Sequence, residues 1–181
     1  MDKHLENQMV RNCQRGDRKA LEMLVTTLQK PVYNAAYRML GNADDAADVT
    51  QATFVSVFEN IDKFDPKYRL FSWTYRIAVN KALDQLKSRG RTAPLENAPE
   101  DTTVDSPPAS ASLSQASDDV QAALMALSED YRSVIVLRYF NDCSYDEIAQ
   151  ILDVPAKTVK SRLFSARQQL KDRLHQHGTP S

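Results

Sequence analysis

The sequence predicts an all-α protein made of two small helical domains that are joined by a flexible acidic linker. Apolar residues recur at helical spacing on both sides of residues 92–117, whereas this central segment is rich in Pro, Ser, Thr and Ala and has no sustained helical period. Residues that start or end helices, such as Asp17 and Gly41, stand at the ends of the periodic runs. The expected domains are therefore residues 1–91 and 118–177.

The first domain is expected to contain four helices. Asp17 can cap the first, and Pro31 is expected to open a second that ends at Gly41. Apolar residues at spacings of three and four predict a third helix over about 43–60 and a fourth over about 71–88.

The second domain begins with an apolar helical stripe over residues 120–127, followed by a helix that opens near Ser128. Ser144 and Glu147 form a capping box of the S-x-x-E type, and Pro155 suits the first turn of a final helix. Two helices joined by a tight turn, the second basic on its free face, predict a helix-turn-helix, with a plain helical hairpin as the alternative.

The nearly neutral net charge conceals two basic segments. The 181 residues include 23 Lys or Arg and 24 Asp or Glu. Residues 67–91 nevertheless carry seven basic side chains against Asp84 alone, and residues 156–173 carry six against Asp172 alone. Two cationic segments on either side of an acidic spacer favour a nucleic-acid partner, although a charge run by itself is usually a solvated face.

Two further patterns nominate binding residues. On the helix expected over 43–60, Asp44, Asp45, Asp48 and Gln51 share one side. The helix dipole accounts for acids in a first turn but not for Asp48 and Gln51, so a protein-binding face is a second interpretation.

Aromatic and basic residues alternate from Phe64 onward, as single-stranded DNA binding requires, because rings stack on unpaired bases while cations neutralise phosphates. Burial preferences favour a core position for Phe71, Trp73 and Ile77. The side chains expected to face solvent and contact DNA are Lys67, Tyr68 and Asn80.

Several classes of function are disfavoured. Cys13 and Cys143 have no metal-site or disulfide spacing and suit small core positions, so neither a metal nor a cofactor is expected. No apolar run is long enough to cross a membrane and no secretory signal is present, which predicts a cytoplasmic chain without membrane insertion. No nucleophile, general base or metal cluster suggests catalysis.

Four segments of the sequence resemble motifs of one known protein family. Residues 152–167 (LDVPAKTVKSRLFSAR) and 128–149 resemble region 4 of the extracytoplasmic-function sigma factors, which are promoter-recognition subunits of bacterial RNA polymerase. Residues 44–54 (DDAADVTQATF) resemble the polymerase-binding motif of their region 2, and residues 71–84 (FSWTYRIAVNKALD) their promoter-melting segment. The resemblance covers nearly everything except residues 92–117 and the chain ends.

The resemblance implies a role for each motif: region 2 binds core polymerase and opens the −10 element, and region 4 reads the −35 element. Its expected polymerase contacts, on the clamp helices of the largest subunit, are Asp44, Asp45, Asp48, Gln51 and Phe54, with Phe54 supporting its helix from within. The expected −10 contacts are Lys67, Tyr68, Arg69, Trp73, Arg76, Asn80, Lys81 and Lys87. The expected −35 contacts are Lys157, Thr158, Lys160, Ser161, Arg162, Phe164, Ser165 and Arg167.

The expected partners are core RNA polymerase (clamp helices and flap region), promoter DNA, and an anti-sigma factor that could hold the chain at the inner membrane. The chain departs from the family pattern in two places: Ser165 stands where a basic residue is common, and Asp142-Cys143 replaces a Gly and an apolar residue. The alternatives are an autonomous helix-turn-helix regulator, a nucleic-acid enzyme and a pure protein-interaction module. None of these accounts for both the Asp48/Gln51 face and the two basic segments.

Overall fold

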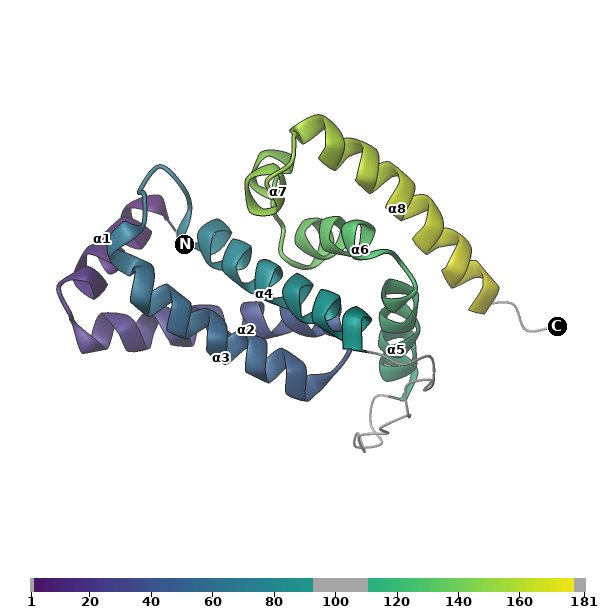
Figure 1. Cartoon of the computed structure of the whole chain (residues 1–181), viewed down its shortest axis with the longest axis horizontal. Helices are drawn as coiled ribbons and strands as arrows, with labels where there is room; N and C mark the ends of the chain where they lie inside the picture. Colours follow the sequence, from purple (N-terminus) through teal and green to yellow (C-terminus); the bar gives the residue numbers. More distant parts are fainter. Residues whose placement is uncertain (1, 93–110, 178–181) are drawn as a thin grey trace.

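The computed structural model describes residues 2–92 and 111–177, which form helices and no β-strand. The N-terminal half contains α1 (Lys3–Gln14), α2 (Arg18–Leu40), α3 (Ala43–Asn60), the short 3₁₀ turn η1 (Ile61–Lys63) and α4 (Leu70–Thr92). The C-terminal half contains α5 (Ala111–Met125), α6 (Glu129–Ile135), the π-helical turn η2 (Val136–Phe140), α7 (Tyr145–Leu152) and α8 (Ala156–His177). Figure 1 shows α2, α3 and α4 as a bundle, with α8 packed on the other helices of the C-terminal half.

Most of the expected helices are confirmed, together with the residues that start and end them. Asp17 caps α2, since its carboxylate accepts hydrogen bonds from the amides of Lys19 and Ala20 at 2.9 and 3.4 Å. Gly41 ends the same helix in the left-handed conformation, at φ 70°. The capping box of α7 is present in both directions, at 3.2 Å from the Glu147 amide to Ser144 Oγ and 2.8 Å from the Ser144 amide to Glu147 Oε2.

The prediction of a helix break at Pro31 is wrong, because α2 runs through it without interruption. Proline deprives the Thr27 carbonyl of its usual partner, a loss that normally kinks or ends a helix. Leu28 and Val32, on either side, are completely buried in the same core. Continuous tertiary packing therefore outweighs the local cost of the proline.

One helix was not predicted, and another begins earlier than predicted. Helix α1 is not among the predicted helices, yet it buries Met9, Val10 and Cys13 against the bundle. Helix α5 begins at Ala111, within the segment 92–117 that was expected to be linker. Residue 92 ends α4, and residues 93–110, including the acidic Glu96, Glu100, Asp101 and Asp105, lie outside the described residues.

The departure from the family pattern at Asp142-Cys143 has a simple physical explanation. Asp142 adopts φ 51°, a left-handed conformation that glycine reaches most easily and that Asp tolerates better than most residues. Cys143 is 4 % exposed and fills an apolar position, as its sequence context predicts.

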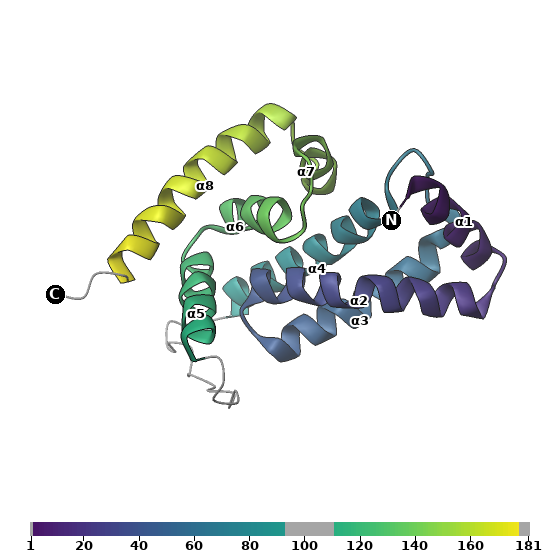
Figure 2. The same cartoon turned by 180° about the vertical axis from the view of Figure 1, so that it is seen from behind.

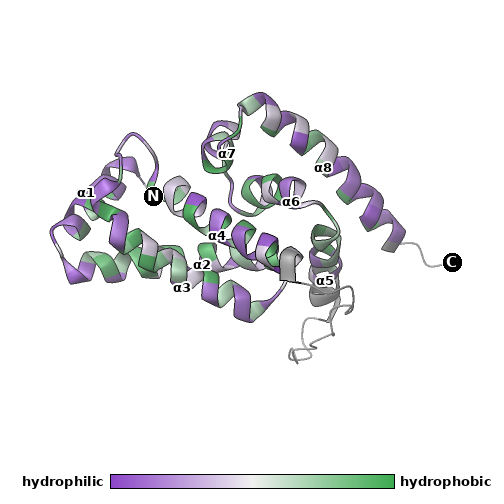
Figure 3. Cartoon of the chain, viewed as in Figure 1, coloured by the Kyte–Doolittle hydropathy of each residue, from purple (hydrophilic) through white to green (hydrophobic). Residues whose placement is uncertain are grey.

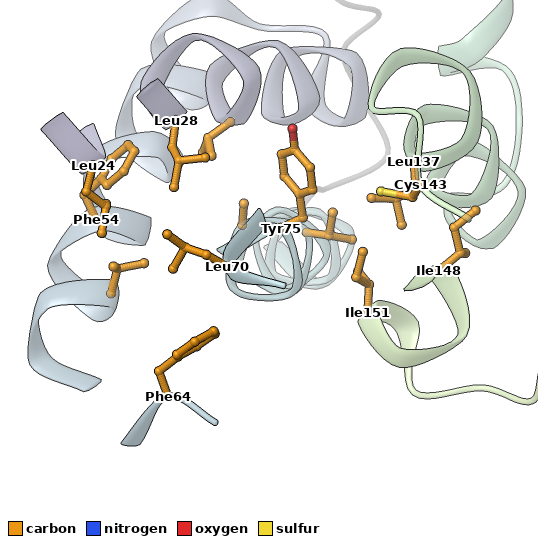
Figure 4. Close-up of a cluster of buried hydrophobic side chains, with 14 of the residues drawn as sticks. Leu24, Leu28, Phe54, Phe64, Leu70, Tyr75, Leu137, Cys143, Ile148 and Ile151 are labelled. Atoms are coloured by element: carbon orange, nitrogen blue, oxygen red, sulfur yellow. The ribbon is translucent and has the colours of Figure 1, made fainter. Parts of the chain in front are cut away.

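A continuous core joins the two halves. Figure 3 shows hydrophobic residues on the inward sides of the helices, and the outer surface of α8 is largely hydrophilic. Within the core, Leu70 and Tyr75 of α4 lie between Leu24 and Leu28 on one side and the C-terminal half on the other (Figure 4). The residues from that half are Leu137, Cys143, Ile148 and Ile151. Helix α4 is thus packed on both sides, by α2 and α3 and by α7 (Figure 2).

Candidate functional site

Helix α3 presents a polar face beside an apolar groove. Asp44, Asp48 and Gln51 are exposed on it, whereas Asp45 is held within the chain by Gln85 Nε2 at 2.8 Å and by an ion pair with Arg89. The four residues of the expected polymerase-binding face therefore fall into two groups. Asp45 ties α3 to α4, and the other three remain available to a partner.

The groove lies between α2 and α3 and has a volume of about 620 Å³. Gln51 belongs to its lining, and Phe54, which is 7 % exposed, forms part of its wall and supports α3 from within. Val55 and Phe58 are 50 % and 39 % exposed at the same groove. An apolar groove whose polar lining includes the amides Gln29 and Gln51 and the cation Lys30 is suited to receive a helix from another protein.

The loop before α4 and the exposed side of α4 carry the expected −10 contacts. Lys67, Tyr68, Arg76, Asn80 and Lys87 are exposed, and Trp73 and Lys81 are half-buried. The Trp73 ring packs edge-on against Phe64, with ring centroids 5.3 Å apart, which agrees with the core preference inferred for it from the sequence.

A polar concavity of about 460 Å³ lies at the junction of α3, η1 and α4. Trp73, Asn80 and Lys81 of the expected −10 contacts line it. The rest of the lining is Ser56, Asn60, Lys63, Ile77 and Asp84, so one carboxylate faces the hollow beside the two ammonium groups. The aromatic edge, the amide groups and the ammonium groups supply stacking, hydrogen bonding and charge in one hollow. These features suit a nucleotide.

Arg69 shares its charge with two carboxylates from distant parts of the chain, whereas Lys67 lies 4.0 Å from its neighbour Asp65. Arg69 Nη2 lies 3.2 Å from Glu6 Oε1, and its Nη1 lies 3.7 Å from Glu147 Oε1. Glu6, only 1 % exposed, also accepts a hydrogen bond from the amide of Leu70, the first residue of α4. No local pattern indicates that Glu6 or Glu147 would contact Arg69, because these positions are 63 and 78 residues away in the chain.

Helices α7 and α8 form the expected helix-turn-helix. Val159, Leu163 and Ala166 are buried on the inner side of α8. The outer side exposes Lys157, Lys160, Ser161, Phe164 and Arg167, with Thr158 and Ser165 partly buried between the two sides. Figure 1 shows this helix along the edge of the molecule, where a DNA groove could reach it.

The aromatic and basic residues of α8 differ in their ties to the chain. Phe164 is 70 % exposed, so it contributes little to the core. Arg162 pairs with Asp130 at 2.9 Å, and Arg167 donates a hydrogen bond to the Tyr139 hydroxyl at 3.3 Å. These contacts hold both arginine side chains along the protein surface.

Two other features are absent from residues 2–92 and 111–177, namely a metal-binding group of side chains and a membrane-spanning helix. No group of three or more His, Cys, Asp or Glu side chains there could hold a metal ion. Within the same part of the chain, no helix combines the length and the apolar character needed to cross a lipid bilayer.

Comparisons with known proteins agree with this arrangement. The family model for sigma-70 region 2 matches residues 24–92, and the model for sigma-70 region 4 matches residues 117–170. The ECF RNA polymerase sigma factor SigW of Bacillus subtilis is 32 % identical, over 91 % of this chain and 94 % of its own length. The ECF RNA polymerase sigma-E factor of Escherichia coli is 33 % identical, over 96 % of this chain and 97 % of its own length.

Solved structures extend the likeness to three dimensions. CnrH, in complex with the cytosolic domain of CnrY, matches 98 % of this chain and 100 % of its own with a TM-score of 0.75 and 26 % identity. RpoE of Bartonella quintana, in complex with the anti-sigma factor NepR, matches 87 % of this chain and 98 % of its own with a TM-score of 0.70 and 25 % identity.

The exposed α3 face, the aromatic and basic side of α4 and the helix-turn-helix of α7 and α8 thus occur in the order that defines one family. Sigma factors direct RNA polymerase to promoters and are not a class of enzymes. With both regional models matched and relatives aligned over nearly its whole length, the chain belongs to the extracytoplasmic-function sigma factors of the sigma-70 family.

Proposed function

We propose that three separate surfaces carry the steps of promoter recognition by this sigma factor. Residues 1–91 act as region 2, residues 118–177 as region 4, and residues 92–117 connect them. The α3 face docks on core polymerase, the exposed side of α4 captures the −10 strand, and α8 reads the −35 duplex. Docking holds the two DNA-binding surfaces on one platform, so each raises the effective concentration of the other.

The observation that carries the polymerase assignment is the exposed pair Asp48 and Gln51 on α3, of which Gln51 lines the 620 Å³ groove. Neither side chain makes a hydrogen bond or an ion pair within the described residues, whereas Phe58 and Val55 leave apolar area uncovered at the groove. A helix pair such as the clamp helices of the largest subunit would cover this area and meet the polar rim. The flap region of the polymerase is the corresponding partner for the C-terminal half.

Run-off transcription tests this assignment. Purified core polymerase is incubated with genomic fragments, with or without the chain, and the 5′ ends of the transcripts are sequenced. Discrete start sites that share two upstream motifs at fixed spacing are expected, and Asp48→Arg combined with Gln51→Ala should abolish them. Glu59→Arg is the matched control, because Glu59 is exposed on the same helix but does not line the groove.

A negative result has a defined meaning. If no start site appears although the chain alone protects DNA from cleavage, the surfaces belong to an autonomous regulator. If the double variant and Glu59→Arg transcribe equally, the polymerase docks elsewhere.

The DNA assignments rest on the exposure and chemistry of the two surfaces. Tyr68 can stack on a flipped base, and Asn80 offers both a donor and an acceptor to a base edge. Lys160, Ser161 and Phe164 face outward on α8, where a major groove could receive them. Arg162 and Arg167 lie along the flanks of the helix and suit phosphates.

We also propose an anti-sigma factor as a partner and the cytoplasm as the working compartment. Support comes from CnrH and RpoE, which match most of this chain and were solved with CnrY and with the anti-sigma factor NepR, respectively. The test begins with the proteins recovered with the tagged chain from its own cells. One of them, purified and added back, should suppress run-off transcription in proportion to its concentration; failure of every recovered protein to do so contradicts the proposal.

A further inference from the structure

Tyr139 presents an aromatic ring at the surface of the C-terminal half. It lies in the π-helical turn η2, between α6 and α7, and is 51 % exposed. Leu137, in the same turn, is completely buried, so the turn is anchored in the core while the Tyr139 ring remains outside it. Single π-helical turns are rare and occur frequently at functional sites. The exposed ring therefore calls for a contact beyond the fold itself.

The Tyr139 hydroxyl is hydrogen-bonded to α8. Arg167 Nη1 donates to Tyr139 Oη at 3.3 Å. A guanidinium can only donate, so the hydroxyl acts as the acceptor in this bond and its own proton remains available to another acceptor. Among the described residues, the Tyr139 hydroxyl makes no second hydrogen bond.

Arg167 also retains most of its capacity to donate hydrogen bonds. It is exposed and forms no ion pair within residues 2–92 and 111–177, whereas Arg162 pairs with Asp130 at 2.9 Å. A guanidinium carries several N–H groups, and the contact with Tyr139 uses only Nη1. The Tyr139 hydroxyl and the remaining N–H groups of Arg167 thus offer neighbouring donors, one set of them charged. This arrangement suits the oxygens of a phosphate.

The position of this pair on α8 fits the edge of a DNA groove. Arg167 follows Phe164 by three residues and Lys160 by seven, so the three side chains lie on one side of the helix. At about 1.5 Å per residue, Arg167 stands roughly 10 Å farther along α8 than Lys160. In a helix-turn-helix the N-terminal part of the second helix contacts base edges. A residue farther along that helix is therefore placed beside the sugar–phosphate backbone.

We propose that Tyr139 and Arg167 together bind one backbone phosphate at the edge of the −35 element, with Tyr139 as a DNA contact supplied from outside the helix-turn-helix. This inference rests on the proposed role of α8 at the −35 element. The Tyr139 hydroxyl donates to one phosphate oxygen and the Arg167 guanidinium to another, while the hydrogen bond between the two side chains is kept. Tyr139 thus binds the phosphate and also holds Arg167 beside it.

Removal of the hydroxyl tests the site. Tyr139→Phe keeps the exposed ring, so thermal unfolding should be unchanged. In complex with core polymerase, this variant should bind promoters found by run-off transcription about two- to tenfold more weakly, as expected for the loss of one hydrogen bond. Because no charge is lost, the slope of log affinity against log salt should stay that of the wild type.

Tyr131→Phe is the matched control for this measurement. It removes the same group from a tyrosine in the first turn of α6, whose hydroxyl makes no hydrogen bond among the described residues. It should bind promoters like the wild type. Equal affinities of the Tyr139→Phe and Tyr131→Phe holoenzymes overturn the proposal.

Neutral phosphates separate a direct contact from mere bracing of Arg167. Promoter duplexes are prepared with a methylphosphonate in place of one phosphate, at successive positions along the −35 element. At one position this replacement should weaken the wild-type holoenzyme strongly, and it should cost Tyr139→Phe and Arg167→Ala clearly less, because each variant has already lost part of that contact. If every replacement costs Tyr139→Phe as much as it costs the wild type, the tyrosine touches no phosphate and the shared site is refuted.

The same variants separate failure of this inference from failure of the −35 assignment. If Arg167→Ala or Phe164→Ala weakens promoter binding while Tyr139→Phe binds like Tyr131→Phe, α8 still contacts the −35 element and only the tyrosine site is refuted. If Arg167→Ala, Phe164→Ala and Tyr139→Phe all bind promoters like the wild type, the −35 assignment itself fails.

Discussion

Arg132 Nη1 donates a hydrogen bond to the Met39 carbonyl at 2.6 Å, which joins α6 to the end of α2. The other nitrogens of the same guanidinium donate to the carbonyls of Leu124, Met125 and Leu127 at 2.9 to 3.0 Å. Burial lowers the pKa of Arg132 by removing water from its charge, and these four carbonyl dipoles replace that water. The Arg132 side chain thus donates hydrogen bonds to carbonyls at the C-terminal end of α5 and links that end to α2 in the N-terminal half.

We expect Arg132→Ala to lower the free energy of unfolding by about 2–4 kcal/mol, because it leaves buried carbonyls without donors. Urea unfolding followed by circular dichroism measures this loss. Arg167→Ala, which truncates an exposed arginine, should stay within about 0.5 kcal/mol of the wild type. Similar midpoints for the two variants would show that the Arg132 network adds nothing to stability.

The sequence predicted the local features of this fold better than the long-range ones. The capping box at Ser144 and the left-handed stop at Gly41 were predictable because each depends on residues within one helical turn. Pro31 misled the prediction because the packing that keeps α2 continuous comes from other helices. The basic and aromatic residues of the candidate site were visible in the sequence, but the pairing of Arg69 with Glu6 and Glu147 was not. Such pairs depend on the tertiary fold and leave no periodic signal.

Glu6 provides a test of one such long-range contact. Its carboxylate accepts a hydrogen bond from the Leu70 amide at 3.2 Å and lies 3.2 Å from Arg69, so it covers the start of α4 as a capping side chain does. Glu6→Ala should destabilise the chain by about 1–3 kcal/mol, because the buried Leu70 amide loses its acceptor.

Glu6→Gln is the informative comparison for this contact. It keeps an acceptor for the Leu70 amide but loses the attraction to Arg69, and it should cost clearly less than Glu6→Ala. Thermal unfolding of the two variants gives the comparison. An equal loss for the two variants would mean that the ion pair, rather than the cap, is the dominant contribution.

Alkaline pH should weaken the fold through Cys143. Burial, assisted by the nearby Glu147 carboxylate, raises the pKa of this thiol from 9.0 to about 12. Its contribution to stability is complete below the unfolded pKa and is lost as pH rises toward the folded one, because only the unfolded chain then releases the proton.

Between pH 7 and pH 10 this thiol should cost the wild type about 1 kcal/mol of unfolding free energy. Cys143→Ala should show a correspondingly smaller decrease over the same interval, whatever its offset at pH 7. Cys13, whose pKa burial also raises, contributes equally to both proteins and cancels in the comparison. Burial is the largest cause of the raised pKa of Tyr75 and Cys143 is a smaller one, so most of the Tyr75 contribution cancels as well. Parallel stability curves for the two proteins would exclude Cys143 as a source of the pH dependence.

Phe164 allows DNA reading to be separated from folding on α8. Its ring is 70 % exposed and lies on the same side as Lys160, so Phe164→Ala should change the unfolding free energy by less than about 0.5 kcal/mol. The same variant, in complex with core polymerase, should bind the promoters found by run-off transcription more weakly. It should also lose discrimination at one position of the −35 element, because an aromatic ring contacts base edges or thymine methyl groups.

Arg167→Ala is the matched comparison, because an arginine that contacts phosphate acts on all sequences alike. It should weaken binding uniformly and reduce the slope of log affinity against log salt by about one. Filter binding of the holoenzyme at several salt concentrations, on wild-type and mutated −35 sequences, distinguishes the two variants. If Phe164→Ala also reduced the salt slope and left base preference intact, the ring would not be reading sequence, and α8 would contact the DNA chiefly through its backbone.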